Sequence, residues 1–386
     1  MIRFFTTSFP RHADDPAGHF VAALASGLVA AGRTVSVEAA VSKWAPPGVA
    51  IDAWAGRSAR LFTQAGAPES FDSGGLVALA AGAEAGVRVL ARGVALRGRQ
   101  RICVGHWLVP CGPAALAAGG RTVLYAHGSD VALLESLPGG RMLARTLDAR
   151  AAHLNFVSVD LRARFEALLG RSPRAPSTTL PMGVDEPAPD PAALAPHLDH
   201  LPPLPRASLR IVTVSRLVPL KGLDVLADAL AGLEGVLWVA AGEGPELRRL
   251  RERCAARGVA FHAVGPLGPG ARDALLRQAD VFVLPSRAVG TRREGTPLAL
   301  LEAQLAGLPC VASRLGGVPA AASPGGVRLV PPNDPAALRA ALEAFVTEPG
   351  AAARRAAAGR ASADFARRFT WRSLMPAHVS AIVGDP

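Results

Sequence analysis

Two glutamates lie eight residues apart in the stretch RREGTPLALLEAQLAGLPC, residues 292–310. Glu294 precedes a Thr-Pro step, and Glu302 lies inside the apolar run that follows it. Because carboxylates are rarely fully buried without a partner, Glu302 needs one. A carboxylate accepts two hydrogen bonds in a fork, which suits the vicinal hydroxyls of a ribose or a hexose. Two interpretations are open: Glu302 binds the ribose of a nucleotide while Glu294 binds a sugar, or Glu302 forms a salt bridge with an arginine.

Two cations lie five residues apart in SRLVPLKG, residues 215–222, which follows an apolar stretch. Arg216 can bind phosphate oxygens as a bidentate fork and Lys221 as a point charge, and the start of the following helix adds its dipole. Among the 42 Lys and Arg residues of the chain, only Lys43 and Lys221 are lysines. This rarity favours a diphosphate-binding role for Lys221 over that of an ordinary exposed cation.

Two glycines lie in another predicted strand-to-helix turn of the second half of the chain. Gly242 and Gly244 in AGEGPELRRL end a predicted strand just before Pro245 starts a helix, and glycines there permit close backbone approach. The segment is not a G-x-G-x-x-G fingerprint, because the residue three positions after Gly244 is Leu247. A dinucleotide-dependent oxidoreductase is therefore disfavoured.

Thr296 is expected to be the N-cap of the helix that carries Glu302, with Pro297 at its first position. Backbone N–H groups at this helix start would then lack partners within the helix and face a ligand. The core-facing stripe of the helix is expected to be Leu298, Leu301 and Leu305.

Short apolar strands alternate with helices along the chain, which is the pattern of parallel sheets covered by helices on both faces. In the first half, the expected strands are 2–5, 34–38, 101–104, 121–125 and 154–159, with a helix at 17–31. In the second half, the expected strands are 209–215, 236–241, 259–264, 281–284 and 310–313. The helices expected there are 222–233, 245–257, 270–278, 297–306, 335–345 and 351–368, with a terminal helix from 371.

The Pro-rich segment 186–206, EPAPDPAALAPHLDHLPPLPR, interrupts this alternation and predicts a linker. We therefore expect an α/β protein with two doubly wound, Rossmann-like domains, 1–185 and 207–370, facing each other across a cleft. Because open parallel sheets bind ligands at the carboxyl ends of their strands, the chemistry is expected at those two edges.

Composition narrows the class of protein. Half of the residues are hydrophobic and 19% are charged, which favours a packed globular protein. The formal net charge is +11, but no tight cluster of basic residues is interleaved with aromatics, so no nucleic-acid partner is expected. The four cysteines have no C-x-x-C spacing, which favours a reduced, cytoplasmic setting without a zinc ribbon or disulfide framework. The N-terminus turns polar too soon for a signal peptide, and no apolar run suits a spanning helix.

One segment suggests contact with a surface. Residues 86–101, GVRVLARGVALRGRQR, mix Val, Leu and five arginines at near-helical spacing. Such a segment can lie on an anionic membrane or be an ordinary surface helix, and its glycines favour the second interpretation.

Taken together, the motifs resemble those of the family-4 retaining glycosyltransferases, which have the GT-B fold. REGTPLALLEA followed by AGLPCVASRLGGVP resembles the family's signature, VSRLVPLKG its diphosphate loop and AGEGPELRRL its G-x-G-P turn. HGSD resembles its active-site histidine loop, PMGVD the segment before its hinge, and TSFPRHADDPAGHFVAAL its N-terminal loop. RFTWRSL resembles the start of the last helix, 371–386, which in the family crosses back to the first domain.

The resemblance implies a role for each matching residue. Arg216 and Lys221 would stabilise the departing diphosphate. Glu302 would bind the ribose, Glu294 the hydroxyls of the donor sugar, and His127 would approach the transferred sugar. Backbone groups of the donor-binding segments would complete the donor site at Gly18, Gly242, Gly244, Gly295, Thr296, Pro297 and Leu298.

The implied reaction moves a hexose from a nucleotide diphosphate sugar to a glycan, lipid-linked or small-molecule acceptor, as in cell-envelope glycoconjugate synthesis. It would retain the anomeric configuration without a protein nucleophile, a metal or another cofactor. On the acceptor side, His19 is a candidate, and His106 has either an acceptor-binding or a structural role. Asp130 either pairs with the His127 loop or caps the following helix.

The chain departs from the family at three points. Ala320 stands where the family usually has a glutamate, Met182 replaces the usual asparagine, and the N-terminal loop has one glycine where many members have a pair. Two other functions remain open: a GT-B nucleotide-sugar epimerase, and a non-catalytic nucleotide-sugar-binding protein. The presence of both cations and both glutamates argues against a protein that only binds.

Overall fold

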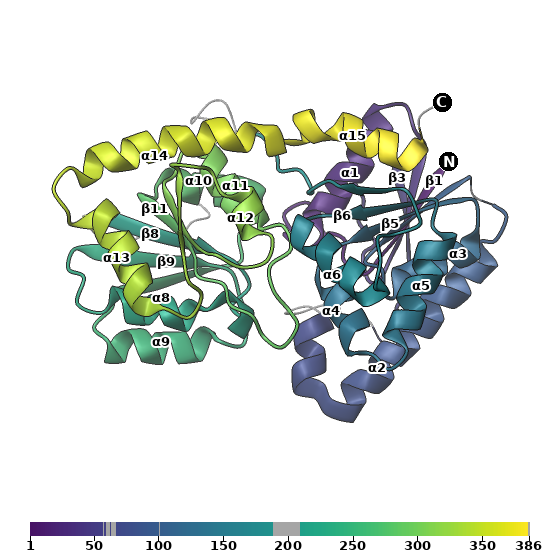
Figure 1. Cartoon of the computed structure of the whole chain (residues 1–386), viewed down its shortest axis with the longest axis horizontal. Helices are drawn as coiled ribbons and strands as arrows, with labels where there is room; N and C mark the ends of the chain where they lie inside the picture. The colour runs from purple at the N-terminus through teal and green to yellow at the C-terminus, as the bar shows by residue number, and fades with distance from the viewer. Residues whose placement is uncertain (57, 59–61, 63–66, 100, 188–208, 385–386) are drawn as a thin grey trace. The chain divides into compact units, whose positions relative to one another are not determined.

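The computed structural model describes residues 1–56, 58, 62, 67–99, 101–187 and 209–384, with no side chains described for 67–79. The chain forms two compact units, Met1–Gly183 with Trp371–Pro386, and Val184–Thr370 (Figure 1). Of the expected linker 186–206, only Glu186 and Pro187 lie within the described residues. No helix in the described ranges is long and apolar enough to cross a bilayer.

The first unit contains a parallel seven-stranded sheet with the order β3-β2-β1-β4-β5-β6-β7. The chain order reverses its direction across the sheet between β1 and β4, which is the switch point of a Rossmann-like sheet. The strands are β1 (Ile2–Thr6), β2 (Val35–Ala39), β3 (Val49–Ala53), β4 (Ile102–His106), β5 (Arg121–Ala126), β6 (His153–Phe156) and β7 (Ser177–Thr179). The helices are α1 (His19–Ala30), α2 (Ala67–Ala95), α3 (Cys111–Ala118), α4 (Ser129–Ser136), α5 (Gly140–Arg150), α6 (Val159–Leu169) and α15 (Trp371–Val383).

The C-terminal helix α15 belongs to this first unit, although it follows the whole second unit in the sequence. It packs on α1 at Gly27, where an added Cβ would lie 1.9 Å from the Cε of Met375. Trp371 packs on Gly183, where an added Cβ would lie 2.5 Å from the indole. These two glycines therefore let α15 lie close to the unit in which it folds.

The second unit contains a parallel six-stranded sheet with the order β10-β9-β8-β11-β12-β13, so that its switch point lies between β8 and β11. The strands are β8 (Leu209–Val214), β9 (Val236–Ala241), β10 (Phe261–Gly265), β11 (Val281–Leu284), β12 (Cys310–Ser313) and β13 (Val327–Val330). The helices are α8 (Leu223–Leu230), α9 (Leu247–Ala256), α10 (Pro269–Arg277), α11 (Leu298–Leu305), α12 (Val318–Ala321), α13 (Pro335–Val346) and α14 (Ala351–Ala366).

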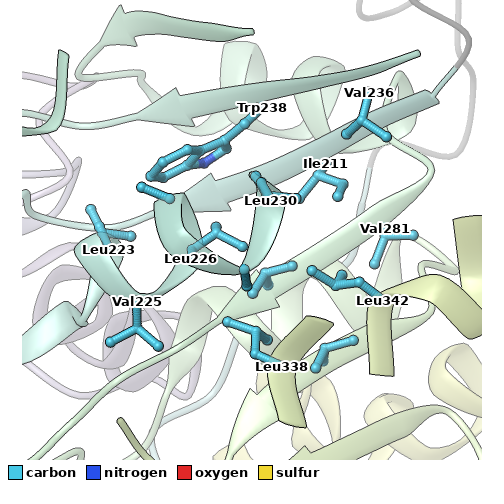
Figure 2. Packing of buried hydrophobic residues seen from close by; sticks show 14 of the residues in the cluster. Ile211, Leu223, Val225, Leu226, Leu230, Val236, Trp238, Val281, Leu338 and Leu342 are labelled. Carbon is cyan, nitrogen blue, oxygen red and sulfur yellow. The ribbon is translucent and has the colours of Figure 1, made fainter. Parts of the chain in front are cut away.

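Alternate residues of the second sheet build two separate cores, because successive side chains of a strand point to opposite faces. Ile211 and Trp238 belong to the core under α8, α9 and α13, part of which is shown in Figure 2. Their neighbours Val212 and Val239 belong to the core under α10, α11 and α12. Burial on both faces explains why the central strands β9 and β11 are continuous apolar runs.

Candidate active site

The loop after β8 carries two of the expected site residues, Arg216 and Lys221, next to the switch point of the second sheet. Leu217 and Val218 are buried and anchor the loop, whose last residues form a 3-10 turn, η3 (Pro219–Lys221). Arg216 is exposed and Lys221 is partly buried. The anchored backbone therefore presents both cations at the carboxyl edge of the sheet.

Gly242 and Gly244 allow the loop after β9 to pack directly against the backbone of the loop after β8. An added Cβ at Gly242 would lie 1.9 Å from the carbonyl oxygen of Ser215, and one at Gly244 would lie 2.3 Å from that of Leu217. In addition, the N–H of Leu217 donates to the carbonyl of Glu243 at 2.7 Å. The glycines that were expected at the donor site thus have a clear packing role, which is to let the two loops interlock.

Glu294 lies at the centre of a charged cluster. Lys221 Nζ donates to Glu294 Oε1 at 2.5 Å, and the Ser286 hydroxyl donates to the same oxygen at 2.6 Å. Glu294 is 7% exposed. Burial pushes the pKa of Glu294 up, but the adjacent Lys221 ammonium, the Ser286 hydroxyl and the charge of Arg216 together hold it below its ordinary value. The carboxylate is therefore ionised at neutral pH.

The helix that follows Glu294 starts one residue later than expected. Pro297 is its N-cap, because its ψ of 83° is not helical, and no side chain caps the helix. The expectation that Thr296 caps this helix and that Pro297 is its first residue is therefore wrong. The N–H of Leu298 is also already bonded, at 3.0 Å to the carbonyl of Thr296. Gly295 and Pro297 are buried beside Glu294.

Glu302 on α11 is paired with Arg272 on α10. Arg272 Nη2 lies 2.8 Å from Glu302 Oε1, and the two side chains are 10% and 11% exposed. The salt bridge that the sequence left open is therefore present. The buried residues on α11 are Leu300, Leu301, Ala303 and Gln304, so the expected stripe is correct at Leu301, while Leu298 and Leu305 are only partly buried.

In the first unit, His127 follows β5, and its loop is built around the carboxylate of Asp130. This carboxylate accepts from the backbone N–H groups of Leu108, His127, Gly128 and Val131, at 2.7 to 3.2 Å. Asp130 is 1% exposed; burial raises its pKa, and the four N–H groups oppose the rise. Asp130 therefore ties the loop after β5 to the loop after β4, and no part of it is presented to an acceptor in this structure.

His106, the last residue of β4, is fully buried and bonded to His127. The distance between His106 Nδ1 and His127 Nε2 is 3.0 Å. His127 itself is only partly buried, and the rings of Trp107 and Phe20 lie 4.6 and 5.3 Å from it, centroid to centroid. Of the open roles for His106, the structure shows a structural one, in contact with the expected active-site histidine.

The N-terminal loop follows the carboxyl end of β1, in the same sheet as the strand that precedes His127. Gly18 has φ +66° and is the N-cap of α1, and an added Cβ would lie 2.5 Å from the backbone of Ser8. His19 is the first residue of α1, and its Nδ1 lies 2.8 Å from the carbonyl oxygen of Pro16. Through Phe20, which contacts His127, this loop and the histidine loop are neighbours at the switch point of the first sheet.

The expected residues thus gather at the two predicted edges, one in each unit. The sequence missed two residues, Ser286 and Arg272. Ser286 lies two residues after the end of β11 and could have been found by this position, whereas Arg272 lies within α10 and had no signal in the sequence. Within the described ranges, no three His, Cys, Asp or Glu side chains form a group that could hold a metal ion.

Comparison with known proteins shows what the chain is similar to. Residues 203–362 match the family model for glycosyl transferases group 1. The chain is 35% identical over 261 residues to the GDP-mannose-dependent alpha-(1-6)-phosphatidylinositol monomannoside mannosyltransferase of Mycolicibacterium smegmatis, covering 64% of this chain and 67% of the relative. It is 29% identical over 309 residues to the related monoacylated-lipid mannosyltransferase of Corynebacterium glutamicum, covering 75% and 78%.

The fold has solved counterparts over its whole length. The sucrose-phosphate synthase of Thermosynechococcus elongatus superposes with a TM-score of 0.74 at 17% identity, covering 98% of this chain and 96% of that one. This likeness concerns the fold alone, and together with the two Rossmann-like sheets it assigns the GT-B fold. The chain therefore belongs to the family of glycosyl transferases group 1 and is a glycosyltransferase of the GT-B fold.

Proposed function

We propose that this glycosyltransferase moves a hexose from a nucleoside diphosphate sugar to a glycan or lipid-linked acceptor and retains the anomeric configuration. The observation that carries the proposal is the cluster of Lys221, Glu294 and Ser286 beside Arg216, at the switch point of the second sheet. A site with two cations and an ionised, buried carboxylate suits a ligand that combines a diphosphate with sugar hydroxyls.

The names of the relatives suggest which donors and acceptors to try first. Two relatives are named as GDP-mannose-dependent enzymes that act on phosphatidylinositol monomannoside, and the matches extend over most of the chain. We therefore take GDP-mannose as the donor and a mannosylated phosphoinositol lipid as the acceptor to be tried first. A relative from Streptomyces avermitilis is named a D-inositol 3-phosphate glycosyltransferase, which makes a water-soluble inositol phosphate the second acceptor to try.

In the proposed reaction, Lys221 and Arg216 supply positive charge where negative charge develops on the departing diphosphate. Glu294 accepts hydrogen bonds from hydroxyls of the donor sugar, and Ser286 keeps its carboxylate in place. When the diphosphate binds, Lys221 is shared between a phosphate oxygen and Glu294. Because the carboxylate is bonded on one oxygen in the ligand-free structure, its orientation is set before the sugar arrives.

The bond changes need no protein nucleophile. The bond between the anomeric carbon and the diphosphate oxygen breaks, and the acceptor oxygen forms its bond on the same face of the sugar. The acceptor proton passes to the departing diphosphate oxygen. His127 approaches the transferred sugar as a neutral ring, since burial, with a smaller effect from His378, lowers the pKa of His127 to about 3.

A lipid acceptor requires access to a membrane surface, and α2 offers a candidate contact. Its inner face is buried, and Gly93 allows a close approach to α3, where an added Cβ would lie 2.3 Å from the carbonyl oxygen of Ala114. Its outer face exposes three apolar side chains, Val87, Leu90 and Val94, at 68%, 41% and 56%. The following arginines, Arg97, Arg99 and Arg101, are exposed and make no ion pair with the described residues.

We infer peripheral contact between this face of α2 and an anionic lipid surface. The test is co-sedimentation with vesicles of phosphatidylcholine alone and with added phosphatidylinositol. Binding that needs the anionic lipid, and that falls when Leu90 and Val94 are replaced by Glu, supports the inference. Equal sedimentation with both kinds of vesicle would refute the inferred contact with anionic lipid.

The function itself is tested by thermal stabilisation with GDP, UDP, ADP and their sugar conjugates, followed by product analysis with the donor that binds. A ligand at 100 times its dissociation constant adds about 2.7 kcal/mol of stability. We expect one nucleotide to stabilise the wild type and not Lys221→Ala, and the product to keep the anomeric configuration by NMR. Consumption of the donor without an acceptor would favour an epimerase, and binding without any consumption would favour a binding protein.

A further inference from the structure

Four aromatic side chains stack in a row that leads from α15 to the partly buried His127. We call this row the histidine stack: His106, Tyr125, His127 and His378. The ring centroids of His127 and His106 lie 5.3 Å apart at an interplanar angle of 24°. Those of His106 and Tyr125 lie 5.0 Å apart at 29°, and those of Tyr125 and His378 lie 5.7 Å apart at 25°. His106, Tyr125 and His378 are each 0% exposed.

The hydrogen bonds at the far end of the histidine stack fix the tautomer of His378. Its Nε2 lies 3.0 Å from the carbonyl oxygen of Pro181, and a carbonyl oxygen can only accept, so Nε2 carries the hydrogen. Burial lowers the pKa of His378 to about 4, so the ring is neutral and its Nδ1 is an acceptor. The hydroxyl of Tyr125, 3.0 Å away, must therefore donate to Nδ1. Tyr125 is held in this orientation, and its ring supports the ring of His106.

At the near end, one hydrogen is shared between His106 Nδ1 and His127 Nε2, which lie 3.0 Å apart. Both rings are neutral, because burial lowers both pKa values. Either His106 Nδ1–H donates to His127, or His127 Nε2–H donates to His106. In the second case, the remaining hydrogen of His106 would be on its Nε2.

The surroundings of His106 Nε2 decide between these two cases. This atom is buried and has no hydrogen-bond partner among the described residues. Buried N–H groups without an acceptor are rare in proteins and are costly. His127 is only partly buried, and its Nδ1 has no partner in the described part of the chain, so a ligand or water can reach this atom in either case. The hydrogen therefore belongs on His106 Nδ1, and His106 is the donor.

We propose that His106 is a positioning residue that fixes His127 as the Nδ1–H tautomer, so that His127 offers a hydrogen-bond donor to the transferred sugar. In this state His127 has no free basic nitrogen, because its Nε2 accepts from His106. It can hold a sugar hydroxyl oxygen but cannot take a proton from the acceptor. The inference rests on the proposed contact between His127 and the sugar.

The first test is the ring protonation of the ligand-free protein, measured by two-bond proton–nitrogen correlation NMR with nitrogen-15 histidine and assigned by single substitutions. We expect a protonated Nδ1 and a bare Nε2 on His127, and the same on His106. A protonated Nε2 on His127 would overturn the inference.

The second test compares substitutions of His106. His106→Phe keeps an aromatic ring in the histidine stack but cannot donate, and we expect kcat to fall about tenfold with the donor KM within about twofold. His106→Asn places an amide N–H near the position of Nδ1, and we expect it to restore most of kcat. Wild-type kcat in His106→Phe would refute the positioning role.

A matched control is His153→Gln, since His153 is a histidine of β6 bonded to Thr178 at 2.9 Å and lies outside the histidine stack. We expect it to leave kcat and the His127 resonances unchanged. His127→Ala separates this inference from the proposed function. If that variant transfers sugar at the wild-type rate, the proposed role of His127 is wrong, while the ring protonation still decides the tautomer.

Discussion

The pair formed by Lys221 and Glu294 predicts a stability defect that does not depend on any substrate. In Lys221→Met, Glu294 keeps the hydroxyl of Ser286 but loses the ammonium that opposes the effect of burial on its pKa. The Lys221 and Glu294 side chains are 16% and 8% exposed, so the remaining charge has little access to water. Removing one partner of a buried pair costs about 3–5 kcal/mol. The residual exposure and the Ser286 bond put the expected loss near the lower limit, at about 3 kcal/mol.

The second unit, Val184–Thr370, has the size at which 1 kcal/mol changes Tm by about 2–4 °C. Differential scanning calorimetry at pH 7 is therefore expected to show a transition about 6–12 °C lower in the variant. In the wild type the pKa of Glu294 is below its ordinary value. The stability that Glu294 contributes is therefore fully present at pH values above the ordinary pKa, and it is lost as the pH falls through the lower pKa of the folded state. In the variant, burial raises the pKa instead, so protonation of Glu294 relieves the defect, and the difference in Tm shrinks from pH 7 towards pH 5.

Two controls make this prediction specific. Lys221→Met combined with Glu294→Gln leaves no unpaired charge and is expected to recover most of the lost stability. Lys43→Met replaces the other lysine of the chain, which is exposed, and is expected to change stability by less than about 0.5 kcal/mol. Equal Tm values for Lys221→Met and the wild type, or a defect that persists in the double variant, would refute the account of this cluster.

Three further outcomes follow from the site. Arg272→Met removes the arginine that is paired with Glu302, the residue that the family resemblance assigns to the ribose. We expect calorimetry to show GDP binding at least fivefold weaker (about 1 kcal/mol) and 2′,3′-dideoxy-GDP binding changed by less than twofold; equal losses for both nucleotides would mean that the pair is only structural. Asp130→Asn turns an acceptor of four N–H groups into a group with one acceptor oxygen, and urea unfolding is expected to show a loss of about 2–3 kcal/mol; an unchanged midpoint would count against the role of Asp130 in joining the two loops. Dialysis against EDTA is expected to leave the transfer rate unchanged, since Arg216 and Lys221 carry the charge that stabilises the diphosphate; recovery of a lost rate by a divalent cation alone would contradict that assignment.

The strongly buried strands of the fold could be predicted from the sequence, whereas of the edge strands in the two described sheets only β10, expected at 259–264, was found. β9 and β11 are apolar and buried on both faces, and β8 is mostly so, and all three were found with nearly correct limits. The other edge strands, β3, β7 and β13, are only partly buried, and none of them is a continuous apolar run. These three segments become strands because they pair with a neighbouring strand of the sheet, rather than because of their own residues.

The candidate site shows the same division. Lys221 could be singled out by its rarity and by its place in a strand-to-helix loop, and Glu294 by its place before a Thr-Pro helix start and its spacing from Glu302. The contact between Lys221 and Glu294 joins residues 73 positions apart, and the bond of Ser286 to the same oxygen closes a loop between residues 8 positions apart, so both depend on tertiary packing. The choice between ribose and arginine for Glu302 was open for the same reason, since Arg272 lies on a different helix.

The central claim is tested most directly by incubating the protein with radiolabelled GDP-mannose, with and without a mannosylated phosphoinositol lipid, and measuring the released GDP and the labelled lipid together. The account predicts equimolar GDP and mannosylated lipid, formed only when the acceptor is present, and a loss of at least about a hundredfold in Lys221→Ala. GDP released at the same rate without an acceptor, or an unchanged rate in the Lys221 variant, would contradict it.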